Sequence, residues 1–142
     1  VGPEDKASHG SKGKTKRSEA LFGNAGYWYV YFVYGMYNML NIVTGEKDYP
    51  AAVLIRSIRL YDSRKKSGEY ENINGPGRLT KFLKVNKKFN KKKADKRIGL
   101  WIEDRGIQIS HNQIKKTPRI GVEYAGGCAK KLYRFVLKKQ EL

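Results

Sequence analysis

The sequence predicts an α+β fold, built as a single domain of mainly antiparallel sheet with few helices and a protruding β-hairpin. The chain has 142 residues, of which 39% are hydrophobic and 12% aromatic, which is sufficient for one hydrophobic core. Short segments rich in aromatic and β-branched residues recur along it, whereas helical spacing of apolar residues occurs at one place. No internal repeat is visible, so residues 1–142 are expected to form one domain.

The elements of the first third follow from local composition. Residues 1–20 are polar, rich in Gly, Ser and Lys, and lack periodicity, which predicts a surface loop. Residues 27–34 and 37–44 alternate and are aromatic or β-branched, and Gly35-Met36 interrupts them. This pattern predicts two strands around a tight connection.

The middle of the chain combines one strand, one helix and one basic stretch. Residues 51–58 (AAVLIRSI) form a nearly continuous apolar run that predicts a buried strand, with Arg56 inside it. Residues 74–83 (NGPGRLTKFL) begin with Asn, Gly and Pro and continue with apolar residues at helical spacing, which predicts a helix start. Residues 84–97, here called the basic segment, are expected to be a solvated loop or an insertion.

The last third is predicted to contain short strands, because brief apolar runs alternate there with polar and turn residues. The predicted strands cover residues 98–102, 107–110, 119–124 and 133–137.

Charge and composition limit the function. Thirty Lys and Arg against thirteen Asp and Glu give a net charge of +17, which favours a polyanionic partner. A lysine-rich proteome that keeps its proteins soluble is the alternative. Cys128 is the single cysteine, and no run approaches the roughly 20 apolar residues of a membrane span. We therefore expect an intracellular protein without a membrane partner.

The chemistry-bearing motifs are few. The sequence has no HExxH, P-loop or GxSxG pattern and only two histidines, His9 and His111, so we expect neither a metal nor another cofactor. Its most unusual stretch is YVYFVYGMYNMLN (residues 29–41). Aromatic side chains in such a segment can stack on nucleic acid bases, although many tyrosine-rich strands are simply sheet surface.

Seven motifs together resemble the alkylpurine (3-methyladenine) DNA glycosylase family. In chain order they are GPEDKASHG, TKRSEALFG, YVYFVYGMYNMLNIVTGE, PAAVLIR, NGPGRLTKFL, TPRIGVEYAG and KKLYRFVL. The resemblance implies a monomeric, monofunctional base-excision repair glycosylase whose partner is double-stranded DNA containing damaged purines. Such an enzyme flips an alkylated or deaminated purine out of the duplex and hydrolyses the N-glycosidic bond with an activated water, without a cofactor.

The resemblance assigns three residues to a base pocket. Tyr31 matches one face of an aromatic slot, and His9 matches the residue that closes the slot and hydrogen-bonds the base. Asn41 matches the position whose amide crowds the exocyclic amino group of guanine. Without the motif, His9 would read as a loop histidine and Asn41 as an ordinary strand residue. A kink near Gly35 is expected to keep Tyr31 and Tyr34 from lying on opposite faces of the sheet.

Other matched positions contact DNA or hold the water. Tyr34 matches the hairpin-tip residue that fills the space left by the flipped base, and Met36 follows it at the tip. Arg56 matches the arginine near the water and the flipped nucleotide's phosphate; a structural ion pair is the alternative. Ile120 matches the position whose backbone carbonyl holds the water. Three cations correspond to phosphate-contacting positions or are solvated charges: Lys14, Arg17 and Arg78.

Two departures from the family pattern stand out. The family carries Glu-Thr-Glu-Ala-Tyr, with the general-base glutamate, just before the GPED loop, and this chain begins at Val1. We expect that the N-terminal part is missing from the sequence, and that the chain alone binds lesions but releases base at least about 10²-fold more slowly than with the motif. The second departure is Gly127-Cys128, where the family has Glu-Trp, which could loosen packing near the water site.

Three functions remain open on the sequence alone. The first is the glycosylase, and the second is a catalytically silent DNA-binding or lesion-sensing module without the glutamate. The third is a basic RNA-binding domain with convergent tyrosines. A Glu-x-Glu-x-Tyr motif upstream would favour the enzyme.

Overall fold

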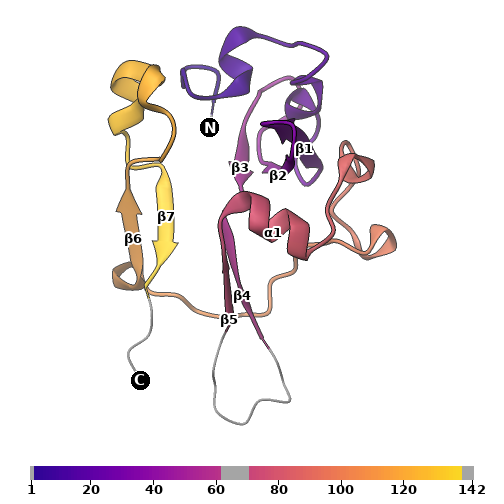
Figure 1. Ribbon diagram of the computed structural model, residues 1–142, viewed down its shortest axis with the longest axis vertical. Helices are drawn as coiled ribbons and strands as arrows, with labels where there is room; N and C mark the ends of the chain where they lie inside the picture. The colour runs from indigo at the N-terminus through magenta and orange to yellow at the C-terminus, as the bar shows by residue number, and fades with distance from the viewer. Residues whose placement is uncertain (1, 62–70, 139–142) are drawn as a thin grey trace.

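The computed structural model describes residues 2–61 and 71–138 (Figure 1). These residues form three small antiparallel sheets, one α-helix and several short 3₁₀ turns. The prediction of an α+β fold with few helices and mainly antiparallel sheet is therefore confirmed. None of the helices in the two described ranges has the length and hydropathy needed to span a bilayer.

The largest sheet contains the predicted pair of strands. β1 (Trp28–Val33) pairs antiparallel with β2 (Tyr37–Val43), and β2 pairs with β3 (Ala52–Leu54) on its other side. The strands end within about one residue of the predicted limits. Between them the Met36 N–H donates to the Val33 carbonyl at 3.1 Å, which closes a tight turn.

The turn explains why glycine stands at its centre. Tyr34 and Gly35 have φ angles of 53° and 65°, and a type I′ hairpin turn requires positive φ at both central residues. Gly35 adopts this conformation at little cost, whereas Tyr34 is strained in it. The chain therefore reverses at Tyr34 and Gly35, after β1 has ended at Val33 and next to the tight connection that the sequence predicted.

The apolar run at residues 51–58 is not one strand, contrary to the prediction. It contributes β3 and then β4 (Ser57–Leu60), which pairs with β5 (Glu71–Asn74) in a separate sheet. Ile55 N–H still bonds the first sheet at the Leu40 carbonyl, while the Arg56 carbonyl already accepts from Gly75 N–H in the second. The chain changes partner strands at Arg56, and apolar composition alone does not reveal such a change.

The helix lies where the sequence predicts it. α1 (Pro76–Phe82) begins with Pro at its first turn and packs on β2, with Leu79 fully buried. Thr80 anchors the helix by donating from its hydroxyl to the Asn38 carbonyl at 2.8 Å. Gly77 allows the close approach, because a Cβ there would lie 2.7 Å from the Tyr37 ring.

Two apolar clusters lie on the two faces of the large sheet. The cluster on the α1 side consists of Trp28, Val30, Leu40, Leu79 and Val85. The cluster on the opposite side consists of Ala20, Leu21, Tyr29 and Val43. The N-terminal residues cover this second face, so the predicted surface loop has buried positions and forms two 3₁₀ turns, η1 (His9–Lys12) and η2 (Glu19–Phe22).

The basic segment is more ordered than the sequence suggested. It forms two further 3₁₀ turns, η3 (Lys87–Phe89) and η4 (Lys96–Ile98), and it contacts β1. Its lysine side chains are exposed, as expected for a solvated region.

The C-terminal third differs most from the prediction. Of the four strands expected there, only the last is confirmed, as β7 (Arg134–Leu137). Its partner β6 (Ile114–Thr117) was not predicted. The two strands form a separate antiparallel pair beside the other sheets (Figure 1). The remaining segments are loops or the 3₁₀ turns η5 (His111–Gln113) and η6 (Glu123–Lys130). Their apolar runs lack a strand partner within the described ranges, and a strand requires one.

Candidate functional site

An aromatic cluster forms where η1 meets the hairpin. The Nδ1 atom of His9 lies 2.7 Å from the Tyr29 hydroxyl, within hydrogen-bond distance. The His9 and Tyr31 rings meet edge to face with centroids 4.5 Å apart, and the two tyrosine rings are 5.2 Å apart. Ser8 caps η1 by accepting from Gly10 N–H and so fixes the loop that carries His9.

Strand geometry brings Asn41 to the same face of the sheet. Tyr29 and Tyr31 are two residues apart on β1, and the register pairs Tyr29 directly with Asn41. The buried Asn41 amide donates from Nδ2 to the Tyr29 carbonyl at 3.1 Å and to the Met39 carbonyl at 3.2 Å. These bonds fix the orientation of the carboxamide.

The structure thus brings together His9, Tyr31 and Asn41, the three residues predicted for a pocket. It adds Tyr29, which the sequence reasoning missed. Period-two alternation from Tyr31 could have found it, because residues two apart share a face of the strand.

The rings of this cluster are uncharged at neutral pH. Burial lowers the pKa of His9, and the nearby charges of Arg17 and Lys12 lower it further. Burial raises the pKa of Tyr29, and it also raises the pKa of Tyr31 although Arg17 opposes the shift. The cluster therefore offers neutral aromatic faces.

Two arginines flank the cluster. The Arg17 guanidinium carbon lies 5.9 Å from the centre of the Tyr31 ring, and Arg17 Nη2 donates to the Phe32 carbonyl at 3.2 Å. Arg56 is partly buried, and burial followed by the positive charge of Arg134 lowers its pKa. No carboxylate in residues 2–61 and 71–138 forms an ion pair with Arg56, so the structural ion pair considered from the sequence is not observed there.

The hairpin tip presents two apolar side chains to solvent. Tyr34 is 87% exposed and Met36 is 64% exposed. Large exposed apolar side chains at a turn are unusual in a surface made for water alone, and they commonly mark a binding site.

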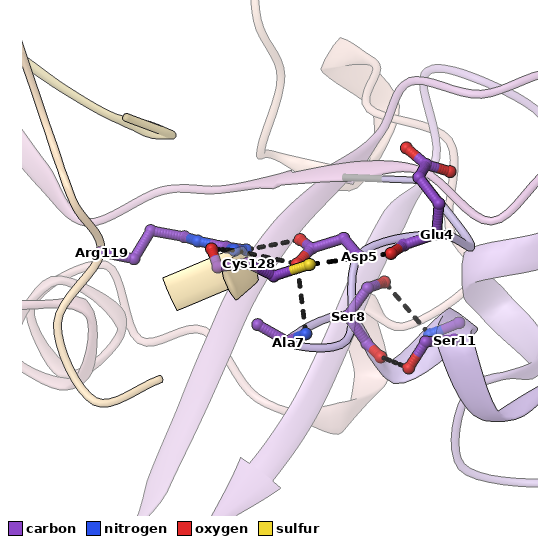
Figure 2. A network of polar contacts seen from close by, with 8 residues as sticks. Glu4, Asp5, Ala7, Ser8, Ser11, Arg119 and Cys128 are labelled. Atoms are coloured by element: carbon purple, nitrogen blue, oxygen red, sulfur yellow. Dashed lines mark hydrogen bonds and ion pairs between the residues drawn. The ribbon is translucent and has the colours of Figure 1, made fainter. Parts of the chain in front are cut away.

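Ile120 follows Arg119, which forms a buried ion pair with Asp5 in the N-terminal segment that also carries His9. Figure 2 shows this contact between Arg119 and Asp5. Arg119 donates from Nη1 and Nη2 to the two carboxylate oxygens of Asp5 at 2.5 and 2.9 Å. Nη2 also donates to the Cys128 carbonyl at 3.0 Å. Ile120 itself is 60% exposed, next to Arg119. The loop is therefore held to the N-terminal segment by one bidentate contact.

The environment of Asp5 keeps its carboxylate ionised. Burial raises its pKa, but hydrogen bonds from Arg119 and from the Ala7 N–H outweigh burial, and the pKa lies below its usual value. The sequence reasoning missed Asp5 and Arg119 as partners. Each belongs to a quoted motif, but no local pattern links positions 114 residues apart.

The Gly127-Cys128 departure has a local consequence in the structure. The Cys128 thiol lies 3.8 Å from the Glu4 carbonyl, so this turn still contacts the N-terminal loop (Figure 2).

The remaining predicted cations lie away from the cluster. Lys14 is exposed, with its ammonium 3.8 Å from an Asp48 oxygen, and Arg78 is exposed on α1. Neither makes a hydrogen bond, ion pair or ring contact with the cluster residues among those described. In the same part of the chain, no three His, Cys, Asp or Glu side chains gather closely enough to hold a metal ion.

Comparison with known proteins agrees with the motifs. The model of the methylpurine-DNA glycosylase (MPG) family matches residues 1–141. A protein of Ehrlichia chaffeensis named "Putative 3-methyladenine DNA glycosylase" is 42% identical over 137 residues, or 96% of this chain and 72% of the relative. Proteins of the same name from Methanocella arvoryzae and Sodalis glossinidius are 40% and 41% identical, each over 95% of this chain and over 70% and 73% of their own lengths. The chain belongs to the methylpurine-DNA glycosylase family.

Proposed function

We propose that this protein is a DNA base-excision repair glycosylase that flips damaged purines out of duplex DNA and hydrolyses their N-glycosidic bond with an activated water. The observation that carries the proposal is the cluster that His9 of η1 forms with Tyr31 and Asn41 of the hairpin, whose tip exposes Tyr34. Family membership and the names of the relatives agree with it.

The aromatic cluster is proposed to form the pocket for an alkylated or deaminated purine. Stacking of a base on an aromatic ring stabilises the complex by about 1–3 kcal/mol. The neutral rings of His9 and Tyr31 provide such surfaces. Asn41 is held by two backbone carbonyls and cannot turn away without losing both bonds. A fixed amide excludes guanine through its exocyclic amino group, while hypoxanthine lacks that group.

Tyr34 is proposed to fill the gap left in the base stack, with Met36 beside it. Apolar wedges at a hairpin tip stabilise an unstacked duplex because they stack where the flipped base stood. The high exposure of both side chains supports this role, since nothing in the described structure occupies their surfaces.

Arg56 and the loop of Ile120 are proposed to serve the reacting nucleotide. A partly buried guanidinium without a carboxylate partner attracts a phosphate or a polarised water, because its charge is otherwise uncompensated. The ion pair of Asp5 with Arg119 fixes the loop whose Ile120 carbonyl is proposed to orient the water. Further phosphate contacts are assigned to Lys14, Arg17 and Arg78.

The environment of Asp5 bears on a second candidate, lesion recognition without chemistry. A general base needs a pKa near the working pH and a free lone pair. Asp5, in the loop that carries His9, has a lowered pKa and accepts three hydrogen bonds. Asp5 therefore makes a poor base, and Glu4 beside it is exposed to solvent.

Two measurements on one duplex test the proposal. The duplex carries a single hypoxanthine next to 2-aminopurine, whose fluorescence rises when its neighbour leaves the stack. A rise in fluorescence together with release of free hypoxanthine supports the glycosylase. A rise without release supports the silent lesion-binding module. Equal fluorescence and affinity for the hypoxanthine duplex and an undamaged duplex overturn both.

A further inference from the structure

The basic segment (residues 84–97) lies along the edge of β1 that does not pair with β2, and it has no assigned role. It contains eight Lys and Arg residues and one acidic residue, Asp95. The Trp28 N–H donates to the Lys92 carbonyl at 2.8 Å, and the Lys91 N–H donates back to the Trp28 carbonyl at 2.9 Å. Farther along the strand, the Val30 N–H donates to the Asn90 side chain at 3.0 Å. Backbone bonds thus fix the segment against the hairpin.

Two cations contact the same residue of the hairpin, Phe32. The Lys87 ammonium lies 5.5 Å from the centre of the Phe32 ring, and Arg17 binds the carbonyl of the same residue. Phe32 is two residues before Tyr34, the exposed side chain at the tip. Positive charge therefore flanks the part of the hairpin that is proposed to enter DNA.

Most of the segment's charge is uncompensated. Lys91 pairs with Glu19, Lys96 with Glu103 and Arg97 with Asp95. The other lysines of the segment form no ion pair with a carboxylate of the described residues, and these are Lys84, Lys87, Lys88, Lys92 and Lys93. Closely spaced like charges repel one another, and a polyanion relieves that repulsion while it releases its own counterions.

We propose that the basic segment binds the phosphate backbone of the duplex that the hairpin enters, as a contact surface separate from the base pocket. This inference rests on the proposed function, because the hairpin determines where the duplex lies. The segment runs beside β1 from Phe32, whose ring Lys87 contacts, to Tyr27, which forms an isolated β-bridge with Lys93. At about 3.3 Å per residue, this stretch is about 16 Å long.

A charge-matched pair of triple variants tests the proposal. One carries Lys87→Gln, Lys88→Gln and Lys92→Gln, and the control carries Lys115→Gln, Lys130→Gln and Lys138→Gln in the C-terminal part. All six lysines are exposed, so both variants lose three charges at the surface. Thermal melting verifies that each is folded. Fluorescence anisotropy over a salt series gives Kd for an undamaged duplex, a hypoxanthine duplex and a single-stranded RNA.

The expected result is a difference in salt dependence. The slope of log K against log[salt] becomes shallower by about 0.9 for each phosphate that the basic-segment variant no longer neutralises, equally for both duplexes. The control keeps the parent slope. Equal slopes in the two variants would overturn the proposal, and so would a larger decrease in affinity for single-stranded RNA than for the duplex. A parent protein without lesion preference would refute the proposed glycosylase function instead, because the slope comparison does not depend on the lesion.

Discussion

The Arg119 guanidinium binds both carboxylate oxygens of Asp5, across 114 positions of sequence, and this pair joins the loop of Ile120 to the loop of His9. Asp5 is 1% exposed, and the Arg119 side chain is 15% exposed. Removing one partner of such a buried pair leaves the other charge without compensation.

We therefore expect Asp5→Asn to lower the free energy of unfolding by about 3 kcal/mol, measured by urea denaturation. Asp48→Asn is the control, because Asp48 is exposed and lies 3.8 Å from the Lys14 ammonium; it should cost less than about 1 kcal/mol. Similar losses in the two variants would show that the buried pair contributes no more than a surface contact.

The same pair predicts an acid-dependent loss of stability. The pKa of Asp5 is lower in the folded state than its ordinary value of 3.8. Its stabilising contribution is therefore fully present above that ordinary value and is lost as pH falls through the lower folded pKa. Unfolding free energies measured from pH 5 downward, at about half-unit steps, should fall more steeply below about pH 4 in the parent than in Asp5→Asn. Parallel curves would argue against this assignment.

His9 predicts a second pH dependence at higher pH. Its pKa is below the ordinary 6.5, so the folded state favours the neutral ring. Below pH 6.5 the unfolded chain binds the proton first, and folding stability falls until the folded pKa is reached. His9→Gln should remove this decrease, which begins as pH falls below about 6.5. If His9→Gln kept the full decrease in stability, a group other than His9 would be its cause.

Tyr34 is expected to separate stability from function. Tyr34→Ser and Tyr34→Gly should both weaken capture of the flipped base by about 1–3 kcal/mol, seen as reduced 2-aminopurine fluorescence. Affinity for undamaged duplex should stay nearly unchanged, because the ring is proposed to fill a base stack and not to contact a phosphate. Tyr34→Gly should be more stable than Tyr34→Ser by about 1 kcal/mol, since φ is 53° at this position. Undiminished flipping in both variants would remove Tyr34 from the role of wedge.

Asn41 is expected to control discrimination against guanine. Asn41→Ser shortens the side chain and removes the bonds to the Tyr29 and Met39 carbonyls, which leaves room for the exocyclic amino group. The ratio of hypoxanthine to guanine excision from mispaired duplexes should fall. Tyr37→Phe, which keeps the ring at an exposed strand position, serves as the control. An unchanged ratio in Asn41→Ser would contradict exclusion by this amide.

The sequence predicted the β1–β2 hairpin and the start of α1 correctly, because both depend on residues close together in the chain. The alternation in β1 and β2, with Gly35 between them, specified the hairpin, and Pro76 specified the start of α1. Because the face of a strand follows from period two, the grouping of Tyr31 with Asn41 could also be anticipated once the register was known.

Features that depend on distant partners could not be read from the sequence. The break at Arg56 arises because the chain leaves β2 and joins β5, and the missing C-terminal strands lack partners in the described ranges. The Asp5 and Arg119 pair likewise joins segments that are remote in sequence. Strand pairing and ion pairs of this kind depend on tertiary structure. The secondary-structure propensity of individual residues does not predict them.

The contacts along β1 also bear on self-association. Several outward-facing backbone groups of this strand are occupied. Residues 91 and 92 bond both groups of Trp28, the Asn90 side chain accepts from the Val30 N–H, and Arg17 donates to the Phe32 carbonyl. A long aromatic edge strand left open would pair with the same strand of another copy and lead to aggregation. A covering rich in lysine blocks that pairing sterically and repels a like-charged neighbour. The hairpin can thus display exposed aromatic side chains at high protein concentration without becoming a template for fibrils.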